Sequence, residues 1–115
     1  MSTDENDFAG VAWLEPWTLI DAPEREAFER ELLRELLPGH VLFGRTARAI
    51  ARCTDRDDAL FIVDGPRQLA VVHLTYSRAT SGDRPHAMIF ETVSDFVEGC
   101  LSPDHAEFAD DGESD

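Results

Sequence analysis

The chain has 115 residues, a formal net charge of −14 and no lysine, so its ten basic residues are all arginines. Hydrophobic residues make up 43% of it, which is enough for the core of a single domain. Phosphate backbones and anionic lipids repel a surface this acidic. We therefore expect neither nucleic acid nor a membrane among the partners.

The acidity has two explanations. It could attract a basic protein partner, or it could reflect a halophile-like proteome or a GC-rich genome, and we favour the second explanation.

No apolar run approaches the roughly 20 residues that span a bilayer. The acidic residues 1–7 do not resemble a secretory signal, and Cys53 and Cys100 are expected to be reduced thiols. The chain is therefore predicted to be cytoplasmic.

The first apolar segment, residues 8–20, contains Pro16, which argues against a continuous helix and favours an extended segment at a sheet edge. Trp13 and Trp17 are expected to lie over the core as a flap. A platform for an aromatic ligand is the alternative.

A helix is predicted over 22–37. Asp21 and Glu24 can form a capping box, and Pro23 falls in the first turn, where its missing N–H costs little. Apolar residues recur at helical spacing, namely Phe28, Leu32, Leu33, Leu36 and Leu37. The charged side chains of 24–35 are expected to face solvent.

Residues 45–53 fit two patterns. With a period of two, the small residues Ala47, Ala49, Ala51 and Cys53 share one face. With a helical period, arginines 45, 48 and 52 form a basic stripe. We favour a strand, because it could pair with 60–63 across a short turn at 54–58.

Residues 59–75 predict a central β-hairpin around Gly65-Pro66. Both faces of both strands are largely apolar, so the hairpin should be covered on each side. A last strand is expected at 88–90. A short helix capped by Thr92 should follow, and Pro103 should end it.

The histidine pattern gives no metal site, and no catalytic motif or cofactor is predicted. His73 is the most unusual polar residue, because it interrupts the apolar run of the second hairpin strand. It could line a ligand pocket with Tyr76 and with Arg48 or Arg52. We favour a core histidine that bonds to backbone or to a carboxylate such as Asp57.

Arginines 45, 48, 52 and 56 are clustered in an otherwise acidic chain. They could hold an anionic ligand or an acidic partner. We favour the simpler interpretation that they neutralise the acidic residues of 24–35.

The segments Leu37-Pro38-Gly39-His40, Asp57-Asp58-Ala59-Leu60-Phe61 and Ala70-Val71-Val72-His73-Leu74-Thr75-Tyr76 resemble a pattern of small uncharacterised prokaryotic proteins. In that family the histidine-leucine-threonine is commonly followed by tryptophan, where this chain has Tyr76. The resemblance covers the middle third of the chain. It is compatible with a single α+β domain and implies no activity.

Together these patterns predict a leader at 1–7, one α+β domain at 8–103 and an acidic tail at 104–115. The domain is expected to be an antiparallel meander of three to four strands with an N-terminal and a short C-terminal helix packed on it. The preferred function is a non-catalytic binding or accessory protein that contacts a protein partner or its own copy as a homodimer. The alternative is a small enzyme or ligand-binding domain around His73.

Overall fold

The computed structural model describes residues 11, 13–54, 56–65, 67–75 and 86–111. Five strands form one antiparallel sheet in chain order, namely β1 Trp17–Leu19, β2 Ala47–Cys53, β3 Asp58–Val63, β4 Gln68–His73 and β5 Ala87–Phe90. Helix α1 (Ala22–Glu35) joins β1 to β2. A continuous helical run of α2 (Val93–Phe96), the π-helical turn η2 (Val97–Leu101) and α3 (Ser102–Asp111) ends the chain's described part. The predicted α+β class is confirmed, with five strands instead of three or four.

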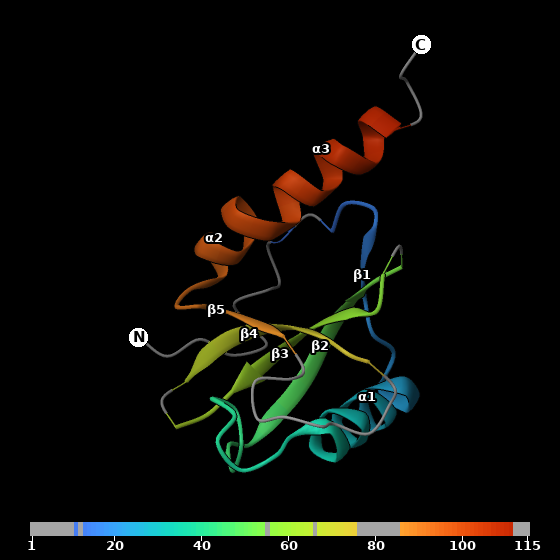
Figure 1. The fold of residues 1–115 in the computed structure, drawn as a ribbon. Coiled ribbons are helices and arrows are strands. Elements are labelled where there is room, and N and C mark those ends of the chain that lie inside the picture. The colour runs from blue at the N-terminus through green and yellow to red at the C-terminus, as the bar shows by residue number, and fades with distance from the viewer. Residues whose placement is uncertain (1–10, 12, 55, 66, 76–85, 112–115) are drawn as a thin grey trace.

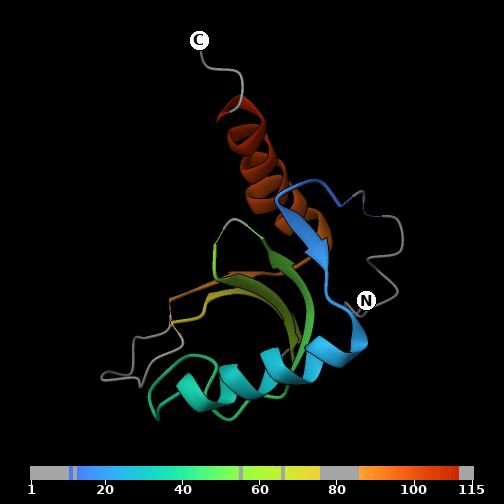
Figure 2. The ribbon, with the colours of Figure 1, turned by 90° about the vertical axis from the view of Figure 1, so that its right-hand side faces the viewer.

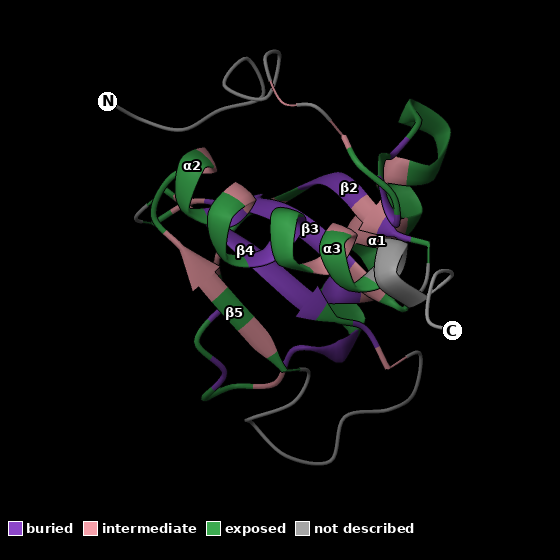
Figure 3. Ribbon diagram, turned by 90° about the horizontal axis from the view of Figure 1, so that it is seen from above, coloured by how far each residue is buried: buried purple, intermediate pink, exposed green. Residues whose placement is uncertain are grey.

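The sheet lies between two helical layers. Figure 1 and Figure 2 show α1 on one face and the C-terminal helices on the other, with α3 projecting away from the body. In the central hairpin, Leu60 and Ile62 belong to the cluster under the C-terminal helices, and Phe61 and Val63 to the cluster on the α1 side. The prediction that both faces of the hairpin are covered is thus confirmed. Figure 3 shows β2, β3 and β4 as a largely buried layer beneath the C-terminal helices, whereas β5 is intermediate or exposed.

The second strand contains a β-bulge between Ala49 and Ala51. Ala47 and Ala49 pack on the α1 side, whereas Ala51 and Cys53 belong to the opposite cluster. The prediction of a strand is confirmed, but the prediction that its four small residues share one face is wrong. The extra residue shifts the alternation by one, so that each face of the sheet receives two of them.

Helix α1 ends two residues before its predicted limit at 37. Asp21 is the N-cap residue, but its side chain makes no capping hydrogen bond. Leu32 and Leu36 are buried in the sheet-facing stripe, as expected, whereas Leu33 is 62% exposed. The apolar stripe is therefore wider than the part of the helix that the sheet covers.

Glu35 contradicts the prediction of a solvated charged face. Its side chain is buried, and its Oε1 accepts hydrogen bonds from the backbone N–H and the hydroxyl of Thr75, both at 2.9 Å. These bonds join the end of α1 to the segment after β4. Only the tertiary fold brings the two residues together, so helical spacing could not have indicated the pair.

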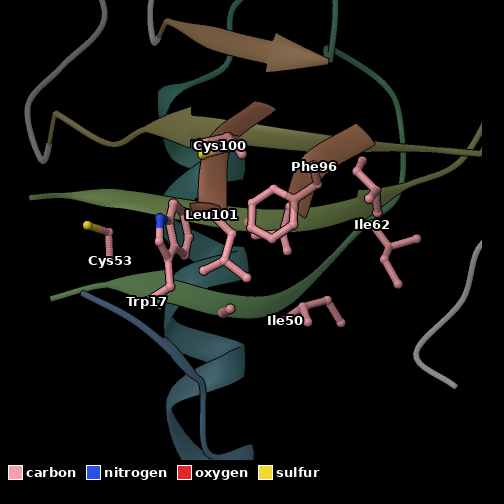
Figure 4. Packing of buried hydrophobic residues seen from close by; sticks show 11 residues of the cluster. Trp17, Ile50, Cys53, Ile62, Phe96, Cys100 and Leu101 are labelled. Atoms are coloured by element: carbon pink, nitrogen blue, oxygen red, sulfur yellow. The ribbon is translucent and has the colours of Figure 1, made fainter. Parts of the chain in front are cut away.

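Trp17 lies inside the core rather than over it. It is 1% exposed, and its ring meets the Phe96 ring edge-on at a centroid distance of 5.5 Å (Figure 4). Trp13 is half-buried and packs on Phe96 at 6.1 Å. The expected flap is thus wrong for Trp17, because its strand pairs with β2 and directs the indole beneath the C-terminal helices.

The C-terminal helix begins as predicted and ends later. The Thr92 hydroxyl accepts a hydrogen bond from Asp95 N–H at 3.1 Å, but the helix continues beyond Pro103 to Asp111. In the π-helical turn just before Pro103, Ser102 N–H donates to the Val97 carbonyl, five residues back. This wider turn relieves the clash that proline imposes on an α-helix. Residues 104–111, placed in the predicted acidic tail, are consequently helical.

None of the helices among the described residues is both long enough and apolar enough to cross a membrane. The predicted leader, residues 1–7, lies outside the described residues.

Candidate functional site

His73 ends β4 and is exposed, with 53% of its side-chain surface accessible. Its Nδ1 lies 2.8 Å from Oδ1 of Asp58, the residue opposite it in β3. The expectation of a core histidine is therefore wrong, whereas the expected bond to a carboxylate is present, with Asp58 as the partner instead of Asp57. His73 is the last residue of its strand, beyond the area that the helices cover, and Asp57 instead offers its backbone carbonyl to Leu74 N–H.

Asp58 begins a polar network that leads to α3. Its Oδ2 accepts a hydrogen bond from Arg56 Nε at 2.8 Å, and Arg56 Nη2 donates to Asp104 Oδ2 at 2.7 Å. The same Asp104 oxygen accepts from Trp17 Nε1 at 2.8 Å. Strands β1 and β3 are thus both tied to the first turn of α3. This arrangement explains the exposed His73–Asp58 pair as one end of a structural tether.

Two groups at this network, the Cys100 thiol and the Arg56 guanidinium, have shifted pKa values. Burial and the Asp104 carboxylate raise the pKa of the Cys100 thiol far above its usual value, so the nucleophilic thiolate is disfavoured at neutral pH. Burial lowers the pKa of Arg56, but its two carboxylate partners outweigh burial and hold that pKa above its usual value. Among the described residues, no three potential metal ligands are grouped together.

The structure separates the other predicted site residues from His73. In the sheet, Arg48 of β2 lies opposite Ile62 of β3, and Ile62 lies opposite Leu69 of β4. Leu69 is four residues, or about 13 Å, from His73 along β4, so Arg48 and His73 lie at different ends of the sheet. Arg52 lies on the other face of the sheet, with its guanidinium 5.8 Å from the Phe28 ring centroid. The bulge in β2 is the reason, because it places Arg48 and Arg52 on opposite faces. Tyr76 lies outside the described residues.

The clustered arginines 45, 48, 52 and 56 do not pair only with the acidic residues of α1. Arg56 pairs with Asp58 and Asp104, neither of which is on that helix. Arg45 Nε donates to the Asp64 backbone carbonyl at 2.9 Å. These arginines therefore link strand ends and turns rather than forming one anion-binding face.

A different site lies along the outer edge of β2. β1 pairs with 51–53, so within the described part of the chain the first half of β2 has β3 on one side and no strand on the other. Asp64 N–H donates to the Thr46 carbonyl, so Thr46 is a hydrogen-bonded position of the β2–β3 ladder. In an antiparallel ladder such positions alternate with positions whose N–H and C=O point outward. The backbone groups of Ala47 and Ala49 therefore point away from β3. Glu29 Oε2 accepts from Ala49 N–H at 2.8 Å. Among the described residues, nothing bonds to the outward N–H and C=O of Ala47.

Two hollows flank this edge and share Glu29, Thr46 and Ala47. The first, here called the arginine hollow, has a volume of about 250 Å³ and is further lined by Arg48, Ile62, Asp64 and Arg67. The second, here called the leucine hollow, has a volume of about 360 Å³ and is further lined by Leu33, Gly44 and Arg45. Neither hollow includes His73. The open edge thus has a charged hollow at one side and an apolar hollow at the other.

Sequence reasoning missed this site. The helical pattern predicts Leu33 in the buried stripe and Glu29 on the solvated face. One signal was available, because Leu33 adds an apolar position on the flank of a stripe that Leu32 and Leu36 already complete. The length of β1, which leaves the edge open, has no such signal.

No protein-family model matches the chain, and neither do curated proteins or solved structures. The resemblance to small prokaryotic proteins therefore stays a prediction, and function is argued from geometry.

Proposed function

We propose that this chain is a non-catalytic binding protein that holds an extended segment of a protein partner on the open edge of β2. The observation that carries the proposal is Ala47, whose N–H and C=O point into the space between the two hollows. An extended segment laid there would complete the row that β1 begins. Its main-chain hydrogen bonds would provide affinity and the hollows would provide specificity.

Open strand edges are usually protected, because they pair with other chains. In this protein the protection is partial. Glu29 supplies the acceptor that a neighbouring strand would supply to Ala49, and it leaves Ala47 exposed to pairing. A half-protected edge favours reversible pairing with a specific segment over uncontrolled aggregation.

The test uses peptides selected from a random library displayed on phage. Ala47→Pro removes the outward N–H without removing a bond to β3, so it should abolish binding of the selected peptides. Ala87→Pro is the matched control, because Ala87 lies on the opposite edge of the sheet and its N–H also points outward by alternation. The proposal is wrong if no peptide is enriched, or if both variants bind the peptides equally.

A second candidate is supported by the exposed imidazole of His73, which Asp58 orients through Nδ1. This would be a small ligand-binding or enzymatic site, without Arg48 and Arg52. Native mass spectrometry of the purified chain would show a bound small molecule that is lost in His73→Ala. A bare chain would count against this candidate.

A further inference from the structure

We infer that the segment bound by β2 carries an aliphatic residue opposite Ala47, and that this residue enters the leucine hollow. The inference rests on the proposed function and adds the chemistry of the partner. It follows from the direction of side chains along the edge, from the apolar surface that the leucine hollow exposes and from the internal pairing of its charged groups.

The backbone sets which hollow each side chain of the segment would enter. Ala47 packs on the α1 side of the sheet. In antiparallel pairing, the residue that exchanges hydrogen bonds with Ala47 lies directly opposite it and points to the same face. That residue would therefore enter the leucine hollow, which α1 lines through Glu29 and Leu33. Its two neighbours would point to the other face of the sheet.

The leucine hollow exposes apolar surface beside the open edge. Leu33 is 62% exposed, and Phe43, which precedes Gly44 of the same hollow, is 49% exposed. Phe43 N–H donates to the His40 carbonyl, and Leu42 N–H donates to the His40 ring, both at 3.0 Å. A turn already held by such bonds loses little conformational entropy on binding. Covering its apolar surface with an aliphatic side chain is favourable, because the surface is removed from water.

The charged groups of the leucine hollow already have partners within the chain. Glu29 Oε2 accepts from Ala49 N–H at 2.8 Å. Arg45 Nε donates to the Asp64 carbonyl at 2.9 Å, and Arg45 Nη2 donates to Gln68 Oε1 at 3.1 Å. A charged side chain entering here would lose water, and the opposite charges of Glu29 and Arg45 would give it no net attraction. The hollow therefore favours an apolar residue over an acidic or a basic one.

The arginine hollow adds no preference for a charge. Arg67 and Asp64 both line it, and Arg67 Nε donates to Asp64 Oδ1 at 2.9 Å. Acidic and basic groups thus balance in this lining. The neighbours of the aliphatic residue can consequently be uncharged residues that favour strands, such as threonine.

The segment comes from a partner and not from a second copy. The open edge is only 47–49, because Ile20 N–H donates to the Ile50 carbonyl and β1 pairs from Ala51 onward. A stable interface takes roughly 20–30 residues from each side. Pairing two such edges would also bring two chains of charge −14 together.

The experiment uses blocked peptides that differ only in a central leucine, glutamate or lysine between threonines, and NMR titration of the labelled protein. The leucine peptide should bind at least about tenfold more tightly than the other two, with amide shifts around Ala47 and Leu33. Leu33→Ser should remove most of this preference, and Leu33→Glu should shift it to the lysine peptide. Leu19→Ser is the control, because Leu19 is also exposed, at 53%, but lines neither hollow.

The outcomes separate the two proposals. If library-selected peptides lose binding in Ala47→Pro but bind Leu33→Ser as tightly as the unmodified chain, the aliphatic residue is wrong and the edge-binding function stands. If neither designed nor selected peptides bind, both are wrong. A dimer that forms without peptide and dissociates in Ala47→Pro would identify a second copy as the occupant and would overturn the inference.

Discussion

Asp104 is the residue through which α3 is attached to the sheet. Its carboxylate accepts hydrogen bonds from Trp17 and Arg56, and a weaker one from the Cys100 thiol at 3.4 Å. Arg56 in turn bridges Asp104 and Asp58, whose side chains are only 16% and 15% exposed. A carboxylate that is mostly removed from water needs such partners, since an unsatisfied one costs free energy. Trp17 and Arg56, which the sequence offered as parts of possible ligand sites, thus hold α3 in place.

Replacing Arg56 by alanine should lower the free energy of unfolding by about 1–2 kcal/mol, because two mostly buried carboxylates lose their shared partner. The expected loss in the free energy of unfolding is no larger, because the Arg56 side chain is 39% exposed and solvent screens part of the interaction. Urea denaturation measures it. Arg30→Ala is the control, because its pair with Glu26 is largely exposed, and should cost less than about 0.5 kcal/mol. Equal losses in both variants would contradict the tether.

Helix α1 does more than cover one face of the sheet. Through Glu29 it also occupies part of the open edge of β2, at the N–H of Ala49. A partner strand that pairs with Ala49 as well as Ala47 must displace this carboxylate. The same contact that protects the edge would therefore compete with the proposed binding.

Glu29→Ala should consequently bind edge peptides about tenfold more tightly, because a hydrogen bond to a charged group no longer has to be broken first. Isothermal titration calorimetry with one selected peptide measures the change. Glu26→Ala, on the same helix but paired with Arg30, should leave the affinity unchanged. Weaker binding in Glu29→Ala would show that the carboxylate contacts the peptide and does not compete with it.

The whole molecule carries a charge of −14 on a body with extents of 45 × 34 × 26 Å. Charges of one sign on a compact surface repel each other, and folding brings them closer together than they are in the unfolded chain. Added salt screens this repulsion within a Debye length. The fold should therefore be less stable at low ionic strength.

Raising the salt concentration from near zero to about 0.3 M should stabilise the fold by about 1 kcal/mol, or about 5 °C in Tm. Thermal unfolding followed by circular dichroism measures this change. Sodium chloride and sodium thiocyanate should act alike in this range if screening is the cause. A Tm that falls with sodium chloride would show that attractive ion pairs, such as those of Arg56, outweigh the repulsion.

The sequence alone determined the elements. Helical spacing predicted α1, two apolar runs around Gly65 predicted β3 and β4, and Thr92 marked the start of the C-terminal helix. These features depend on periodicity and on local capping, which neighbouring residues decide among themselves.

Tertiary structure decided the candidate site. The bulge after Ala49 separates Arg48 from Arg52. The three-residue β1 does not reach Ala47, which among the described residues has a strand on one side only. The carboxylates of Glu29 and Glu35 bond to backbone N–H groups far along the chain. Each of these depends on which segments meet in space, and no local pattern carries that information.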